Sequence, residues 1–178
     1  ALYLTVDGNG VLSSATVFVL SSKGVGGSIV SVPVNADVGF ADDARQSLQQ
    51  VYAAGGVDAM TFAVESLLLL TINDTTVVDA AQLTAFLAPF EPFTITLTSD
   101  VVTETDEGDD PDVLRTGTVV LPAKDAAKVL ISGAGLGAES SRKGNHEALW
   151  AGFVSAVGGG RGTTLPTAVP PANIEEFT

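Results

Sequence analysis

The sequence contains no cysteine and only a single histidine, methionine and tryptophan. Without cysteine the chain has no disulfide, no thiolate nucleophile and no cysteine-ligated zinc or iron–sulfur site. Cations are also scarce, because 8 lysines and arginines stand against 21 acidic residues, which gives a formal net charge of −13. Nucleic-acid binding requires clustered cations against phosphates and is therefore disfavoured, as is a general attraction to anionic lipid surfaces.

Long apolar runs are missing as well. A membrane-spanning helix needs about 20 consecutive apolar residues, whereas the most apolar stretch, residues 64–72, is shorter and is interrupted by Glu65 and Ser66. The sequence begins with the strand-like LYLTV and shows no signal peptide. We therefore expect no membrane span within this sequence, so that any anchor would have to precede it.

The composition that remains is typical of one folded α/β domain. The chain has 178 residues, of which 46% are hydrophobic, enough to build a full core. Three short segments rich in β-branched and apolar residues are separated by glycine-containing turns and predict a β-meander. These segments are Leu2–Val6, Ala15–Leu20 and Ser28–Val32.

Helical periodicity follows the meander. After a polar loop over residues 35–43, Asp42 or Asp43 is expected to cap a helix from Ala44 that stops at Gly55-Gly56. Asp58 would cap the next helix. The apolar stripe of this helix is wide, which predicts that the helix is buried on several sides. The further predicted elements are strands at Thr75–Val78, Phe93–Leu97 and Thr118–Leu121, and helices at Asp79–Leu87, Ala123–Ile131 and Asn145–Val157.

Strands separated by helices indicate an α/β fold. We predict a single layered domain over residues 1–157, with a central mixed β-sheet flanked by helices on both faces, and a C-terminal tail over residues 158–178. Residues 132–144 are rich in glycine and serine and predict a mobile loop. Residues 100–112 predict a solvated acidic loop, because their spacing is not that of a calcium-binding EF-hand.

Two residues are candidates for chemistry on their own terms. Arg142 could bind a phosphate beside the N-terminus of the last helix, or be a solvated loop arginine. His146 could act as a general base, but a hydrogen-bonded, half-buried structural histidine is the alternative. It lies on the predicted apolar, core-facing side of the last helix, with Leu149, Trp150, Phe153, Val154 and Val157. The loop around Lys23 lacks the helix and the Lys-Ser/Thr pair of a phosphate loop, and no serine stands in a G-x-S-x-G elbow.

The order of helices and strands resembles that of the LytR–CpsA–Psr family of cell-envelope proteins. Residues 48–56, LQQVYAAGG, are similar to the family's L-N-A-A-Y-x-x-G-G helix, with Gln49 in the place of the asparagine. Residues 31–35, SVPVN, resemble its S-I-P-R-D motif, with Val34 and Asn35 in the places of the arginine and the aspartate.

Two later segments extend the resemblance. Residues 78–87 are similar to the family's D-F-x-x-F strand–helix segment. Residues 142–146, RKGNH, resemble its R-x-x-R-Q motif, with Asn145 and His146 in the places of the second arginine and the glutamine. The family's early catalytic aspartate would lie near Ser14, where this chain has no carboxylate.

Members of this family resemble transferases that move a glycopolymer from a polyprenyl-pyrophosphate carrier onto peptidoglycan. Such chemistry needs guanidinium groups to hold the pyrophosphate and carboxylates for a divalent ion or a base. The resemblance implies ligand-binding roles here rather than assigned catalytic ones, and no metal site. The residues concerned are Arg142, Lys143, Asn145, His146, Asn35 and Gln49.

We therefore expect an extracytoplasmic cell-envelope domain that is catalytically degenerate. It would bind a polyprenyl lipid, a glycopolymer or a protein partner in an apolar cleft walled by the helix of Phe62 and Leu67–Leu70. Whether the chain is an enzyme stays open. No cofactor is evident, and magnesium enters only if the chain is an active transferase. A membrane anchor is expected in a segment upstream of this sequence.

Two alternatives remain. The first is an active phosphotransferase that attaches glycopolymers to peptidoglycan, with the missing charges supplied from the loop after Pro33. The residues that would supply them are Asp37, Asp42, Asp43 and Arg45. The second is a purely structural domain without a ligand, in which the cleft would be filled by side chains.

Overall fold

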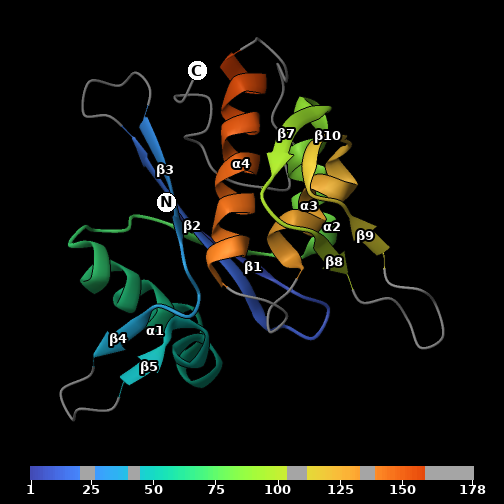
Figure 1. Ribbon diagram of the computed structural model, residues 1–178. Helices are drawn as coiled ribbons and strands as arrows, with labels where there is room; N and C mark the ends of the chain where they lie inside the picture. The colour runs from blue at the N-terminus through green and yellow to red at the C-terminus, as the bar shows by residue number, and fades with distance from the viewer. Residues whose placement is uncertain (21–26, 40–44, 104–111, 133–138, 159–178) are drawn as a thin grey trace.

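The computed structural model describes residues 1–20, 27–39, 45–103, 112–132 and 139–158, apart from the side chains of residues 139–141. In these residues an α/β domain is present, with helices packed around a central sheet (Figure 1). The strands are β1 (Leu2–Val6), β2 (Leu12–Leu20), β3 (Gly27–Val32), β4 (Asp37–Gly39), β5 (Arg45–Ser47), β6 (Thr75–Val78), β7 (Phe93–Leu97), β8 (Val101–Thr103), β9 (Asp112–Leu114) and β10 (Gly117–Leu121). The helices are α1 (Leu48–Leu68), α2 (Ala80–Leu87), the 3-10 turn η1 (Ala88–Phe90), α3 (Ala123–Ile131) and α4 (Glu139–Gly158).

The central sheet has the strand order β3-β2-β1-β6. The first three strands pair antiparallel to one another, so the predicted β-meander is confirmed. β6 pairs parallel to β1 after the crossover through α1, which makes the sheet mixed, as predicted. The strands β7 and β10 form a separate antiparallel pair that packs against α4.

Side-chain alternation along β1 and β2 divides the core into two halves. Tyr3 and Phe18 join the apolar cluster made with α2, α3 and α4. Leu2, Leu4 and Val17 join the cluster made with α1 on the opposite face. Because successive strand residues point to opposite faces, this sheet needs helices on both sides, and the predicted layering is confirmed.

A β-bulge interrupts the pairing of β1 with β2. Thr5 lies opposite Ser14, but the next residue, Val6, lies opposite Leu12, so Ser13 has no partner on β1. An extra residue of this kind leaves its strand kinked and its backbone groups outside the ladder. The Ser13 carbonyl is therefore available to another part of the chain.

α1 begins later than the sequence predicted. Ser47, not Asp42 or Asp43, caps it, in a reciprocal capping box with Gln50; Asp42 and Asp43 lie outside the described residues. Residues 37–39, in the predicted polar loop, and residues 45–47, in the predicted helix, pair as the β4–β5 ribbon. The Gly55-Gly56 stop appears as a kink, because Gly56 has φ 65° and ψ −152°, which no helix can include.

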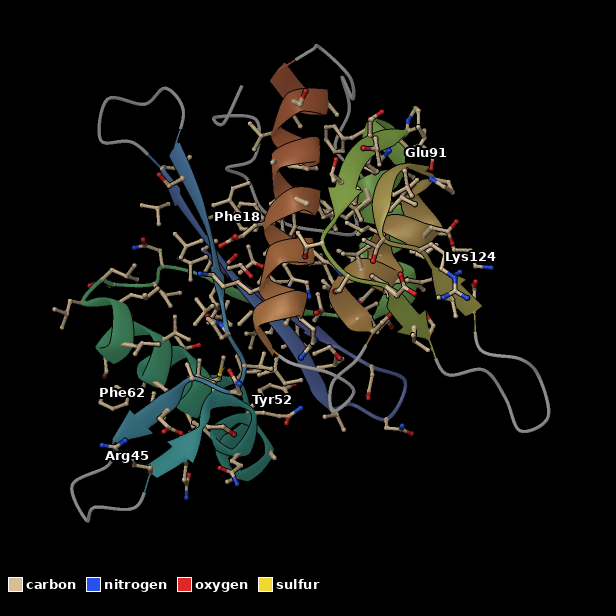
Figure 2. The ribbon with its side chains drawn as sticks, viewed as in Figure 1. Phe18, Arg45, Tyr52, Phe62, Glu91 and Lys124 are labelled. Atoms are coloured by element: carbon tan, nitrogen blue, oxygen red, sulfur yellow. The ribbon has the colours of Figure 1, made fainter. Side chains whose placement is uncertain are left out.

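The C-terminal half of α1 is less buried than predicted. Met60, Ala63 and Val64 pack into the core, but Phe62 is 64% exposed and Leu69 is 92% exposed. Figure 2 shows Phe62 at the outer side of this helix. The prediction of burial on several sides is therefore wrong, because the sheet lies on one side of α1 only and no described element packs over Phe62.

α2 and α3 follow the sequence closely. Asp79 caps α2 in a capping box with Gln82, and α3 has the predicted bounds Ala123–Ile131, with Leu130 fully buried. Proline at position 122 sets the extended backbone from which α3 begins. Both helices pack on the same face of the sheet as α4.

α4 begins earlier than predicted. Residues 139–144, expected to belong to a mobile loop, form its first turns. His146, Leu149, Trp150, Phe153 and Val157 are buried as the predicted apolar face, but Val154 is 51% exposed. β8 occupies the start of the predicted acidic loop. Lys23, residues 104–111, residues 133–138 and residues 159–178 lie outside the described residues, so the predicted tail stays a prediction.

No helix among the described residues is both long and apolar enough to cross a membrane.

Candidate functional site

Four of the six predicted ligand-binding residues lie on α4. Arg142, Lys143, Asn145 and His146 occupy two consecutive turns near its N-terminal end. They were predicted to lie in a loop and at the first residues of a helix, so the earlier start of α4 changes their setting. Inside a helix these side chains point in different directions. Those of Arg142, Asn145 and His146 point into the protein.

Arg142 is only 8% exposed. Its Nη2 donates a hydrogen bond to the carbonyl of Ser13, the residue left over by the β-bulge. The alternative of a solvated loop arginine is therefore wrong. The guanidinium group joins the first turns of α4 to the start of β2, and a phosphate could engage Nη2 only by displacing this carbonyl.

Gln49 reaches the same place from the opposite face of the sheet. Its Nε2 donates to the carbonyl of Leu12 at 3.0 Å. Arg142 from α4 and Gln49 from α1 thus hold two consecutive carbonyls of β2. We name this place the polar junction and define it as Thr5, Ser13, Ser14, Gln49 and Arg142.

The polar junction lies where the family resemblance would place a catalytic aspartate. Instead of a carboxylate it contains the hydroxyls of Thr5 and Ser14, which hydrogen-bond to each other in the buried interior. Among the described residues, no three His, Asp or Glu side chains lie close enough together to hold a metal ion. Hydroxyls that satisfy one another do not provide the carboxylate oxygens that Mg²⁺ prefers, so the junction does not fit this ion.

Asn145 is a structural clamp. Its Oδ1 accepts from the Thr98 amide at 2.8 Å, the Thr98 hydroxyl at 3.0 Å and the Ser99 amide at 3.3 Å. Its Nδ2 donates to the carbonyl and the hydroxyl of Ser99, both at 3.1 Å. Every polar atom of the side chain is used, and the amide fixes α4 to the segment that follows β7.

His146 is 4% exposed, next to Arg142. Burial, together with the charge of Arg142, lowers its pKa to about 4, although a hydrogen bond to the Val129 backbone opposes the shift. The imidazole is therefore neutral at neutral pH. No group among the described residues hydrogen-bonds its Nε2. This histidine is a buried core residue, more buried than the half-buried alternative predicted.

The other two predicted residues lie apart from these. Lys143 is exposed and pairs with Glu147, one turn further along α4, at 3.4 Å. Asn35 is exposed in the turn after β3. The structure therefore brings Gln49 and Arg142 together, leaves Asn35 and Lys143 on the surface, and commits Asn145 to the fold.

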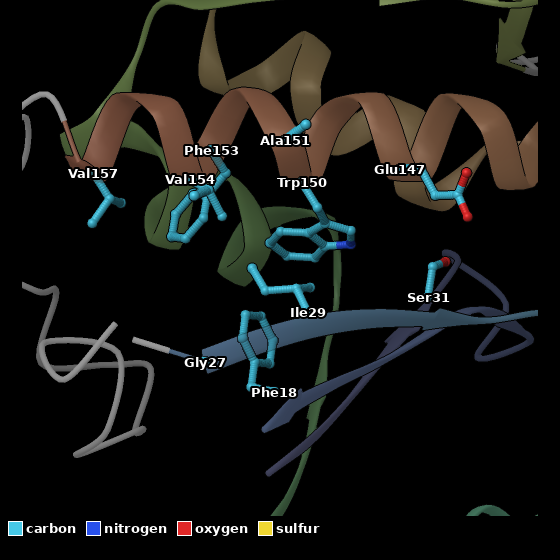
Figure 3. A pocket seen from close by; sticks show the side chains of 10 residues that line it. All are labelled: Phe18, Gly27, Ile29, Ser31, Glu147, Trp150, Ala151, Phe153, Val154 and Val157. Carbon is cyan, nitrogen blue, oxygen red and sulfur yellow. The ribbon is translucent and has the colours of Figure 1, made fainter. Parts of the chain in front are cut away.

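An apolar groove of about 590 Å³ runs between α4 and the strands β2 and β3. Figure 3 shows its floor and walls. Trp150 and Phe18 meet edge to face, with 5.3 Å between ring centres, and Trp150 Nε1 donates to the Thr16 hydroxyl. The wall is thus fixed by ring packing and by a buried hydrogen bond. The lining residues are Phe18, Gly27, Ile29, Ser31, Glu147, Trp150, Ala151, Phe153, Val154 and Val157.

The groove lies elsewhere than predicted. The expected cleft wall on α1 faces solvent at Phe62 and Leu69, whereas the groove described here is on α4. The sequence predicts Trp150 and Phe153 as core residues and gives no role to Glu147 and Ala151. The signal was present, because Glu147, Trp150, Ala151 and Val154 have the i, i+3, i+4, i+7 spacing of one helix stripe.

A second groove, of about 580 Å³, lies between α2 and α3. It is floored by small residues, among them Ala80 and Ala127, and Lys124 and Lys128 flank it. Lys128 is already paired with Asp112 and Asp125. This groove contains none of the predicted site residues.

No protein-family model matches the sequence, and no curated protein matches it. Solved structures do. TagV of B. subtilis is similar with a TM-score of 0.65 and 16% identity, over 87% of this chain and 63% of TagV. TagT bound to LIIa-WTA gives a TM-score of 0.65 and 17% identity, over 88% of this chain and 62% of TagT. A putative transcription regulator from Eubacterium siraeum gives a TM-score of 0.66 and 12% identity, over 99% of this chain and 73% of that protein.

TagV and TagT are LytR–CpsA–Psr proteins, so the predicted LytR–CpsA–Psr-like fold is confirmed. At these identities the similarity establishes the fold. The chain spans less than two thirds of the length of either protein.

Proposed function

We propose that this LytR–CpsA–Psr-like domain acts in the cell envelope as a catalytically silent binding module, which holds a polyprenyl lipid or its glycopolymer conjugate in the groove between α4 and β2–β3. The observation that carries the proposal is the state of Arg142, the first arginine of the family-like RKGNH motif. It is buried and donates to the Ser13 carbonyl. The cation that would hold a phosphate is part of the scaffold.

Phosphoryl transfer requires cations around the transferred group and a divalent ion to offset its charge. Arg142 is engaged with the backbone, Asn145 with five hydrogen bonds, and His146 is neutral and buried. The polar junction does not fit Mg²⁺. The residues that remain are suited to holding α4 on the sheet rather than to catalysis.

The groove supports binding of an apolar ligand. Its volume lies within the range of about 300–1,000 Å³ that is typical of small-molecule sites, and most of its lining is apolar. A structural domain without a ligand would bury these side chains, yet Val154 stays 51% exposed at the rim. TagT, which has this fold, has been seen bound to LIIa-WTA and to LI-WTA, wall teichoic acid compounds, and by this likeness we extend glycopolymer binding to the present chain.

Trp150 offers a direct test, because it is the only tryptophan and lines the groove. We expect a detergent-solubilised short-chain polyprenyl lipid to change its fluorescence in a saturable way. Val154→Asp should weaken binding about ten-fold or more, because it places a charge against the apolar chain. Val120→Asp is the matched control, since Val120 is 63% exposed on β10, outside the groove. Equal affinities in both variants would refute a site in this groove.

Catalysis is tested separately with a polyprenyl-pyrophosphate glycopolymer donor, Mg²⁺ and peptidoglycan. We expect no turnover above a denatured control. Robust turnover that is abolished by Arg142→Ala would overturn the proposal that the domain is catalytically silent.

The alternative, a relocated transferase site, has one pair of residues in its favour. Arg45 on β5 and Asp37 on β4 form an ion pair with 3.9 Å between Nη1 and Oδ2. Both are exposed, however, and Figure 2 shows Arg45 at the periphery on this ribbon, whereas the Arg142 side chain is buried between α4 and β2. Turnover that survives Arg142→Ala but is lost in Arg45→Ala would establish this alternative.

A further inference from the structure

The groove on α4 is polar at one end and apolar at the other. Glu147 and Ser31 face each other at one end, Trp150 lies in the middle, and Val154 and Val157 line the far part (Figure 3). The ten helical steps from Glu147 to Val157 correspond to about 15 Å along the helix axis. An elongated ligand with one polar end is therefore accommodated in a single direction, with its head beside Glu147.

Among the described residues that line the groove, the only charged side chain is that of Glu147, at the polar end. Lys143 pairs with this carboxylate at 3.4 Å but does not line the groove. The pair is exposed, so it holds the lysine only weakly. The chain as a whole adds a net charge of −13, which further disfavours an anionic group at this end.

We infer that the groove selects the uncharged, alcohol-headed form of a polyprenyl lipid, and that Glu147 is the residue that excludes the phosphate-headed forms. The inference rests on the proposed function and narrows its ligand to the free lipid, because a glycopolymer conjugate would carry the pyrophosphate of its carrier. A hydroxyl head can donate to the Glu147 carboxylate and accept from the Ser31 hydroxyl. A phosphate or pyrophosphate brings negative charge towards this carboxylate, and the described lining residues include no lysine or arginine that could offset it.

The test uses the full chain and three probes of equal chain length in the same neutral detergent: a short polyprenyl alcohol, its monophosphate and its pyrophosphate. Binding is followed by Trp150 fluorescence. We expect the alcohol to bind about three- to ten-fold more tightly than either phosphate, because Glu147 is exposed and its charge is partly screened. Glu147→Gln, a substitution at an exposed position, should improve phosphate binding about three- to ten-fold and change alcohol binding less.

Lys143→Gln distinguishes our inference from a competing mechanism, in which a phosphate draws Lys143 away from Glu147 and binds to it. On our inference this variant keeps the preference for the alcohol and weakens the phosphates further. If the pyrophosphate binds more tightly than the alcohol and Lys143→Gln removes that advantage, the inference is wrong while binding in the groove stands.

A failure of the lipid-binding proposal itself would give a different result from a failure of the selectivity. If none of the three probes changes Trp150 fluorescence or raises Tm, the lipid-binding proposal itself is refuted, and the selectivity with it. If all three bind equally to the wild type and to Glu147→Gln, the lipid-binding proposal survives and the role of Glu147 is refuted.

Discussion

Acidification should destabilise the domain through His146 in a defined pH window. The buried imidazole has its pKa lowered to about 4, whereas an unfolded histidine has a pKa of about 6.5. Between these two pKa values the histidine is protonated in the unfolded chain but stays neutral in the native state. Stability therefore rises with pH through this window and falls on acidification. The linkage gives a loss of about 2 kcal/mol from pH 7 to pH 5, and about 3 kcal/mol by pH 4.

The assay is urea unfolding between pH 7 and pH 4, in the wild type and in His146→Asn. Asparagine can keep a donor for the Val129 backbone but cannot be protonated. We expect the variant to be less stable at pH 7 and to lose much less stability on acidification. Asp100 and Asp112 also have lowered pKa values, but their contributions are lost only below about pH 4, outside the window. An equal decline in wild type and variant would refute the reasoning.

Three further substitutions test the packing. Asn145→Ala should lower the free energy of unfolding by about 2–4 kcal/mol, because five hydrogen bonds are lost together; an unchanged urea midpoint would contradict the clamp. Gly152→Ala should cost about 1–3 kcal/mol, since a Cβ there would lie 2.6 Å from the buried Ile95 side chain, whereas Gly158→Ala, with open space, should be nearly neutral. Leu69→Gly should raise Tm slightly, because Leu69 has φ 54° and is 92% exposed; a lower Tm would show that the leucine side chain stabilises the fold.

The parts of the fold that could be predicted are those whose signal is local. Alternating apolar and threonine residues predicted β7, and Asp79 marked the start of α2. The start of α4 was missed because glycine and serine favour loops in isolation, while here the helix is held by long-range hydrogen bonds from Arg142 and Asn145. The ribbon β4–β5 was missed because strands of three residues leave too short a pattern.

The candidate site could be predicted only in part, because its contacts join residues that are distant in sequence. The motif position of Arg142 was visible in the sequence, but its burial was not, because its acceptor is a carbonyl 129 residues away that only the β-bulge frees. Gln49 was chosen by motif alone, and its acceptor, Leu12, is again distant in sequence. The groove combines a helix stripe with alternate residues of β3, and neither half is distinctive by itself.

The β-bulge also bears on how the domain unfolds. The two apolar clusters lie on opposite faces of the sheet and have no side chain in common, so by packing alone each could open independently. Gln49 anchors one helix and Arg142 the other to adjacent peptide groups of β2. Melting either helix would release part of the strand on which the other depends. The halves are therefore expected to behave as one cooperative unit, with the amides of β1 and β2 exchanging their hydrogens only in global unfolding.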